Sequence, residues 1–260
     1  MSVGLQRIKA NIHRIMTNPT WAITLFRRRL FPFQIIMNCP EAYQVIGSWT
    51  FGRAPRLPLT EIFPSIENVN VTIQRAFDRN LEVAMDYHEI LALSCIVKHV
   101  GARNILEIGT SDGNTTLNLA ANSPANACIT TIDLPPDWNG ELGLGVPHLM
   151  VNATARNKIG SQYKSSDCTK KITQVFCDSA TIDWDKMPVP FDMIVIDGCH
   201  YYEYVRKDTE NAMKYLRSGG ILVWHDYGMI EDVSKVVDDT AERLKVTAIR
   251  GSTLAVGIKP

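Results

Sequence analysis

The 260-residue sequence has no uninterrupted apolar run of the roughly 18 residues that a membrane-spanning helix needs. Its early apolar stretch, residues 21–26, is also too short for the core of a secretory signal. We therefore expect a cytoplasmic protein. The six cysteines include no C-x-x-C pair, so their spacing indicates neither a zinc site nor a disulfide framework. Reduced and mostly buried thiols are the simpler interpretation.

Acidic residues are absent before Glu41, although the net charge of the whole chain is zero. Apolar residues are interspersed with the bases of this arm, so it could lie on an anionic membrane surface or dock on a partner. A helix that packs on the rest of the chain or on a second subunit is the alternative. We expect a homo-oligomer and no nucleic-acid partner. The bases are Arg7, Lys9, Arg14, Arg27, Arg28 and Arg29.

The organisation of the chain changes near residue 80. Residues 1–80 show no alternating strand pattern and predict an N-terminal extension of helices and loops, which covers the rest of the chain or makes an oligomer contact. Residues 81–260 predict the main domain. It begins with a helix over residues 81–100, where apolar residues recur at helical spacing, and Gly101 ends that helix.

Strands and helices then alternate, which indicates an α/β fold with a doubly wound, mostly parallel sheet of seven strands. The last two strands form an antiparallel hairpin at the C-terminus. The predicted strands are 104–108, 128–132, 172–176, 191–196, 221–224, 245–250 and 253–258, and the predicted crossover helices are 115–122, 202–216 and 231–244. The long connection 134–171 could hold a lid or substrate loop.

A glycine-containing turn lies between the first strand and the next helix. Glycines there let the backbone approach a ligand, and the start of the helix adds partial positive charge. The turn lacks the G-x-G-x-x-G pattern of dinucleotide sites, because Ser111 takes the place of the second glycine. We predict a nucleotide-like ligand at this turn. Its expected contacts are Glu107, Gly109, Thr110, Ser111, Gly113 and Thr115.

Further acids follow the later strands. Asp133 could accept hydrogen bonds from both hydroxyls of a ribose. Asp178 and Ser179 form a polar pair after the third strand. Each acid taken singly is often a cap or turn residue, but three acids in order, each after a strand, indicate one binding site.

A second group of residues predicts a metal site. Asp197, His225 and Asp226 follow predicted strands, so they should lie at the carboxyl edge of the sheet. Two carboxylates that converge are costly unless a cation or a shared proton compensates them, and Mg²⁺ suits such a pair. The nitrogen of His225 would also suit Mn²⁺, Fe²⁺ or Zn²⁺, or the ring only orients its neighbours.

Three motifs carry a resemblance to a known family. The E-x-G-x-x-x-G series at 107–113 resembles motif I of class I S-adenosylmethionine-dependent methyltransferases. The I-D-G-x-H-x-Y-x-x-V-x-x-D series at 196–208 and the G-G-x-x-x-x-H-D series at 219–226 resemble metal-dependent small-molecule O-methyltransferases. These include the catechol type and the enzymes that modify sugars of macrolide and aminocoumarin antibiotics. The resemblance covers about residues 85–260.

The resemblance implies a fold, a cofactor and site roles. A reversed last strand marks the methyltransferase variant of the sheet, the turn at Glu107 would wrap the methionine part of S-adenosylmethionine, and Asp178 with Ser179 would face the adenine. Asp197 and Asp226 would be metal ligands, with His225 where a third acid often stands. The implied activity is O-methylation of a small-molecule hydroxyl, on a vicinal diol, a sugar or a catechol, assisted by Mg²⁺, Mn²⁺ or another divalent ion.

The identity of the general base stays open at this point. Cys199 stands where sugar-modifying relatives can place a basic aspartate. His200 could take the proton of the acceptor hydroxyl, or its ring could hydrogen-bond a loop carbonyl in a structural role. Two other readings also remain. One is an NAD(P)-dependent oxidoreductase, which the missing glycine disfavours, and the other is a non-catalytic S-adenosylmethionine-binding module, which Cys199 keeps open.

Overall fold

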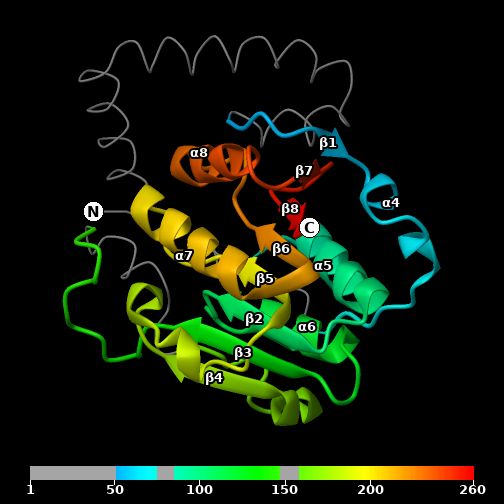
Figure 1. Ribbon diagram of the computed structural model, residues 1–260. Helices are drawn as coiled ribbons and strands as arrows, with labels where there is room; N and C mark the ends of the chain where they lie inside the picture. Colours follow the sequence, from blue (N-terminus) through cyan, green and yellow to red (C-terminus); the bar gives the residue numbers. More distant parts are fainter. Residues whose placement is uncertain (1–50, 75–84, 147–157) are drawn as a thin grey trace, which may run out of the picture. The chain divides into compact units, whose positions relative to one another are not determined.

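The computed structural model describes residues 51–74, 85–146 and 158–260 (Figure 1). Residues 51–260 form one compact unit. The basic arm, the predicted boundary at residue 80 and the middle of the long connection lie outside the described ranges. Within those ranges, no helix is both long enough and apolar enough to cross a bilayer.

The described strands form one sheet of eight, in the order β1-β7-β8-β6-β5-β2-β3-β4. All neighbouring pairs are parallel except those of β8, which runs antiparallel to β6 and β7. The predicted parallel sheet with a reversed last strand is thereby confirmed. The strands are β1 (Arg56–Leu57), β2 (Asn104–Ile108), β3 (Cys128–Asp133), β4 (Ile172–Phe176), β5 (Phe191–Ile196), β6 (Leu216–Trp224), β7 (Val246–Ile249) and β8 (Ala255–Ile258).

Strand β1 is additional to the seven predicted strands. It comes from a segment that we expected to hold only helices and loops. It pairs with β7 at the edge of the sheet, and the short helices α4 (Leu59–Ile62) and η1 (Ile66–Asn68) follow it. The expectation was wrong for this segment because a strand of two residues is too short to show an alternating pattern.

Among the described residues, four longer helices cover the two faces of the sheet, α5 (Tyr87–Val100), α6 (Asn114–Asn122), α7 (Tyr202–Tyr215) and α8 (Glu231–Thr240). Successive strand residues point to opposite faces, as the pleat requires. Ile105 of β2 therefore packs in a core with α5 and α6, whereas its neighbour Leu106 packs in a second core with α7 and α8. This is the doubly wound arrangement predicted from the sequence.

The strand order indicates at which point of the sheet a ligand would bind. From β2 the chain proceeds to β3 and β4 on one side, whereas β5 and β6 lie on the other side of β2. The connections after β2 and β5 therefore leave the sheet in opposite directions. Open α/β sheets bind ligands at such a switch point, outside the carboxyl ends of the strands.

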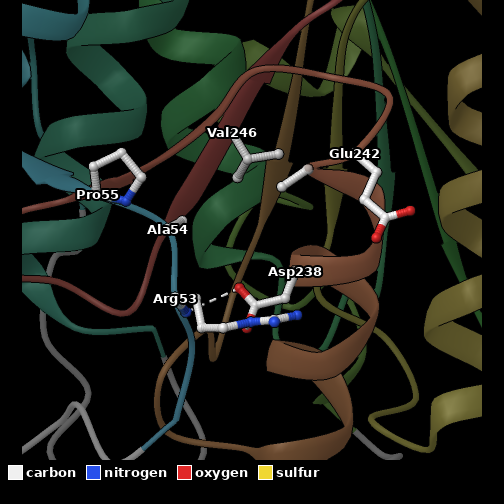
Figure 2. A pocket seen from close by; sticks show the side chains of 7 residues that line it. Arg53, Ala54, Pro55, Asp238, Glu242 and Val246 are labelled. Carbon is white, nitrogen blue, oxygen red and sulfur yellow. Dashed lines mark hydrogen bonds and ion pairs between the residues drawn. The ribbon is translucent and has the colours of Figure 1, made fainter.

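The segment before β1 is fastened to α8 by polar contacts. The Tyr227 hydroxyl accepts a hydrogen bond from the Ala54 amide (2.6 Å) and donates one to Asp238 (2.7 Å), which also bonds the Arg53 amide at 3.0 Å. Figure 2 shows Arg53 and Asp238 in a hollow beside Val246. Tyr227 is fully buried, so it belongs to the core, and the hollow includes none of the predicted site residues.

Candidate active site

The turn after β2 lies directly beside the end of β5. Gly109, Ser111 and Gly113 all have positive φ, at 101°, 49° and 85°. Gly109 packs against the backbone of Asp197, and Gly113 packs against the ring of Tyr163. The space left by the absent side chains of the two glycines is therefore filled by Asp197 and Tyr163. The close contact at Gly109 brings the predicted cofactor turn against the predicted metal site.

Glu107 is a buried acid near the end of β2, two residues before Gly109. One carboxylate oxygen accepts hydrogen bonds from the hydroxyls of Thr116 and Thr131. The other oxygen, Oε1, is buried and has no hydrogen-bond partner among the described residues. Burial raises the pKa of Glu107 to about 8, although the two hydroxyls oppose the shift. A buried oxygen that lacks a donor fits a ligand with a donor group, as the methionine part of S-adenosylmethionine has.

Asp133 is the last residue of β3, and it hydrogen-bonds the same turn. Its Oδ2 accepts from the amides of Thr110 (3.1 Å) and Ser111 (2.9 Å), and its Oδ1 accepts from the Leu134 amide at 2.8 Å. Thr115 turns towards Met85, with its hydroxyl 3.8 Å from the sulfur. The structure thus places Asp133 beside the turn, while the contact with a ribose stays a prediction.

Asp178 and Ser179 lie after β4, as predicted, and both bond to the chain itself. Asp178 accepts hydrogen bonds from the amides of Gly143 (2.7 Å) and Ala180 (2.9 Å) and from the Tyr204 hydroxyl (2.8 Å). The Ser179 hydroxyl donates to Asp208 at 3.2 Å. Asp178 therefore fastens the connection after β3, and the predicted contact of this pair with adenine stays a prediction.

Asp197, His225 and Asp226 converge at the ends of β5 and β6. The two strands are parallel neighbours, so the residues that follow them meet at one edge. The three side chains offer ligand atoms that all lie within 4.8 Å of one another. The Nδ1 atom of His225 lies 2.9 Å from Asp197 Oδ1 and 3.3 Å from Asp226 Oδ2. The structure thus brings together the three residues predicted as metal ligands.

These residues fit a divalent cation. Asp226 is buried, and its Oδ1 has no hydrogen-bond partner in the described part of the chain. Its φ of 59° is an uncommon backbone conformation for a residue other than glycine, of the kind that gathers at functional sites. Two carboxylates and one imidazole are a donor set that Mg²⁺, Mn²⁺ and related ions accept.

The electrostatics of the cluster show how the protein compensates two carboxylates without a metal. Burial lowers the pKa of His225, but Asp197, Asp226 and Glu89 outweigh burial and hold that pKa well above its ordinary value. Burial opposes ionisation of Asp197, yet the charge of His225 and the ring hydrogen bonds of the two histidines lower the pKa of this carboxyl. A positive imidazole thus occupies the place where a cation would help.

Glu89 is a member of the cluster that the sequence analysis missed. Its Oε2 lies 3.0 Å from His225 Nε2. It stands in the first turn of α5, where it also accepts a hydrogen bond from the Asp86 amide at 3.1 Å. The D-x-x-E pattern at residues 86–89 signals a helix start, so a second role towards a strand far along the chain left no separate trace in the sequence.

His200 lies against the same carboxylates. Its Nε2 is 3.1 Å from Asp226 Oδ2 and 3.9 Å from Asp197 Oδ1, and about a quarter of the side chain is exposed (26%). A purely structural His200 was expected to hydrogen-bond a loop carbonyl, whereas its ring lies against two carboxylates. Cys199 packs near Leu142 and Tyr204, and burial raises the pKa of its thiol to about 11. A thiol of that pKa stays protonated near neutral pH.

The comparisons with known proteins fit this geometry. Residues 106–227, from β2 to the end of the carboxylate cluster, match a family described as "Methyltransferase domain". This part of the chain is therefore similar to a methyltransferase domain. Its strand order, with a reversed β8, is that of the class I methyltransferase fold, as predicted.

Two curated relatives of the chain are plant proteins. The chain is 29% identical over 154 residues to tapetum-specific methyltransferase 1 of Arabidopsis thaliana, an alignment that covers 59% of this chain and 58% of the relative. It is 26% identical over 150 residues to caffeoyl-CoA O-methyltransferase of Populus kitakamiensis, with 56% of each chain covered. The chain thus spans somewhat more than half the length of these two relatives.

Solved structures share the fold at low sequence identity. The O-methyltransferase TomG of Streptomyces achromogenes, solved with S-adenosylmethionine, has a TM-score of 0.53 at 17% identity, over 77% of this chain and 96% of its own. A methyltransferase of Podospora anserina, solved with S-adenosylhomocysteine, has a TM-score of 0.51 at 13% identity, over 80% of this chain and 89% of its own. These similarities establish the fold of the domain.

Proposed function

We propose that the protein is an S-adenosylmethionine-dependent O-methyltransferase that acts, with the help of a divalent cation, on a hydroxyl group of a small molecule. The observation that carries the proposal is the position of the Asp197, His225 and Asp226 cluster immediately beside the turn that begins at Glu107. A methyl donor and a metal-bound acceptor would therefore meet at one edge of the sheet. The curated relatives, one of them named an O-methyltransferase, support the same reaction class.

The residues of the turn would hold the donor. The unpartnered Oε1 of Glu107 would accept a hydrogen bond from the methionine part, and Asp133 would accept from the ribose. Asp178 and Ser179 would border the adenine. S-adenosylmethionine would supply a methyl group already activated by the sulfonium charge, so the protein has chiefly to align acceptor and donor.

The cluster would hold the cation and the acceptor. Asp197, Asp226 and His225 would be its ligands, with Mg²⁺ as the expected ion and Mn²⁺ also compatible with the imidazole. A bound cation would lower the pKa of a coordinated hydroxyl and favour acceptors with two neighbouring oxygens. Vicinal diols, sugars and catechols are the expected classes of acceptor.

His200 would be the group that moves the proton. Its ring nitrogen lies beside Asp226, whose negative charge would stabilise the ring once it is protonated. Cys199 cannot replace it in this role because its thiol remains protonated. His200 would take the proton of the acceptor hydroxyl at a ring nitrogen as the methyl group is transferred.

The test is transfer of a radiolabelled methyl group from S-adenosylmethionine to a panel of catechols, vicinal diols and sugars, with Mg²⁺ or with EDTA. We expect labelled product that disappears in EDTA and returns with added Mg²⁺ or Mn²⁺. Full turnover in EDTA would remove the metal from the proposal. Binding of S-adenosylhomocysteine without any product would favour a non-catalytic module, and a thermal shift with NAD alone would favour an oxidoreductase.

A further inference from the structure

Glu89 has more hydrogen-bond donors around it than a helix start requires. Its Oε1 accepts from both the amide and the hydroxyl of Thr253, each at 2.6 Å. Its Oε2 faces the Asp86 amide at 3.1 Å and His225 Nε2 at 3.0 Å. Glu89 is almost fully buried, at 4% exposure. The carboxylate is therefore held from three sides, by the start of α5, by the turn between β7 and β8, and by the residue after β6.

This environment determines which atom of His225 carries a hydrogen. Two backbone amides point at Glu89, and amides can only donate, so both carboxylate oxygens act as acceptors. The start of α5 favours negative charge at the same place. The ring nitrogen that faces Glu89, Nε2, must then be the donor of the 3.0 Å contact.

The opposite ring nitrogen faces the proposed metal ligands. Nδ1 lies 2.9 Å from Asp197 and 3.3 Å from Asp226. An imidazole that keeps its hydrogen on Nε2 has its lone pair on Nδ1 when it binds a metal. Carboxylates that hydrogen-bond the far nitrogen of a metal-binding histidine fix the orientation of the ring and strengthen the ligand.

We propose that Glu89 is a positioning residue, which holds His225 with its hydrogen on Nε2 and so presents Nδ1 to a divalent cation shared with Asp197 and Asp226. The inference rests on the proposed metal site. It adds the residue that orients the His225 ring so that the ring can bind the metal. Glu89 itself contributes no atom to the cation.

Glu89→Gln is the matched substitution, because glutamine keeps the size of the side chain and can still serve at the third position of a helix start. Its amide nitrogen would face donors on one side or the other, so the contact with Nε2–H would be lost or reversed. We expect Mn²⁺ to bind ten- to a hundred-fold more weakly in calorimetry. Binding of S-adenosylhomocysteine should be unchanged, since Glu89 does not line the turn at Glu107.

The control is Asp86→Ala, which weakens the same helix start without touching His225. It should lower the melting temperature and leave Mn²⁺ affinity as in the unchanged protein. Equal Mn²⁺ affinity of Glu89→Gln and the unchanged protein would overturn the role of Glu89 alone. Absence of Mn²⁺ binding by the unchanged protein would overturn the metal site itself, so the two failures are distinguishable.

A second measurement needs no variant. The protein, labelled with ¹⁵N-histidine and loaded with ¹¹³Cd²⁺, should show cadmium coupling at Nδ1 of His225 and an attached hydrogen at Nε2. Coupling at Nε2 would overturn the inference even if Glu89→Gln failed to fold.

Discussion

Gly109 lies so close to Asp197 that a Cβ atom placed on the glycine would come within 2.0 Å of the Asp197 carbonyl oxygen. The same glycine has a φ of 101°, which side chains rarely adopt. The absence of a side chain at Gly109 therefore allows two parts of the site to pack together. These are the turn that would bind the methyl donor and the strand end that would bind the cation.

Gly109→Ala should consequently damage both parts of the site. We expect a loss of about 2–4 kcal/mol in the free energy of unfolding, from the clash together with the strained backbone, and a loss of S-adenosylhomocysteine binding. Urea unfolding and calorimetry would measure the two effects. Gly101→Ala is the control, since its φ is also positive, at 61°, but nothing lies within 4 Å of its added Cβ. It should cost about 1 kcal/mol and leave binding intact.

Asp226→Asn tests the proposed cation ligand with little disturbance of the backbone. Asparagine adopts the left-handed conformation found here more readily than alanine does, and it keeps the shape of the side chain. Turnover should fall at least about 100-fold because a charged ligand is lost, whereas S-adenosylhomocysteine should bind nearly as before. Turnover close to that of the unchanged protein would exclude Asp226 as a metal ligand.

His200 and Cys199 are neighbours in the sequence, but we expect their substitutions to affect kcat very differently. His200→Gln should lower kcat by about 10² to 10⁴-fold, the usual contribution of a general base, with little change in Mn²⁺ affinity. Cys199→Ala should leave kcat nearly unchanged, because a thiol with a pKa of about 11 is not a base near neutral pH. Steady-state kinetics across pH 6 to 9 would separate them, and a large loss in Cys199→Ala would reverse the assignment.

Asp208 should make the stability of the protein depend on pH. It is fully buried with Oδ1 unpartnered among the described residues, and burial raises its pKa from 3.8 to about 7, with the Ser179 hydroxyl opposing and the charge of Asp178 adding to the shift. The folded state thus holds this proton more tightly than the unfolded chain does. Its contribution to stability is complete below about pH 4 and is lost as pH rises through 7.

Asp208→Asn removes this titration while keeping the shape of the side chain. The unfolding free energy of the unchanged protein should fall relative to the variant by up to about 1.4 kcal/mol per pH unit between pH 4 and 7. Urea unfolding of both proteins at pH 5, 6, 7 and 8 would give the difference. Parallel curves would mean that Asp208 is ionised in the folded state throughout.

The sequence was sufficient for most of the sheet and for the convergence of Asp197, His225 and Asp226, because both depend on local pattern. Most of strands β2 to β8 are short apolar runs, although β6 begins at Leu216, five residues before its predicted start, because Arg217 to Gly220 show no strand pattern; Asp197, His225 and Asp226 come just after β5 and β6. Neighbouring parallel strands must bring such residues together. The structure added what depends on contacts between distant segments, namely the pairing of β1 with β7 and the contact of Glu89 with His225.

Other expectations could not be refined from pattern alone. The glycines of the turn looked like space for a ligand, yet Gly109 and Gly113 admit Asp197 and Tyr163 instead. Tyr227 directly follows Asp226 in the sequence, and only the packing around α8 shows that it belongs to the core. Such distinctions depend on which residues surround a side chain in the folded protein. A single sequence does not give those neighbours.

The contact of Glu89 with His225 joins positions 136 residues apart. An unfolded chain would not keep Glu89 beside His225 or orient its ring towards Asp197 and Asp226, so a divalent cation should bind the native protein far better than the denatured one. Ions present at a hundred times their dissociation constant would then add about 2.7 kcal/mol to the free energy of unfolding. A melting curve recorded with a series of metals would rank them by affinity before any acceptor molecule is known.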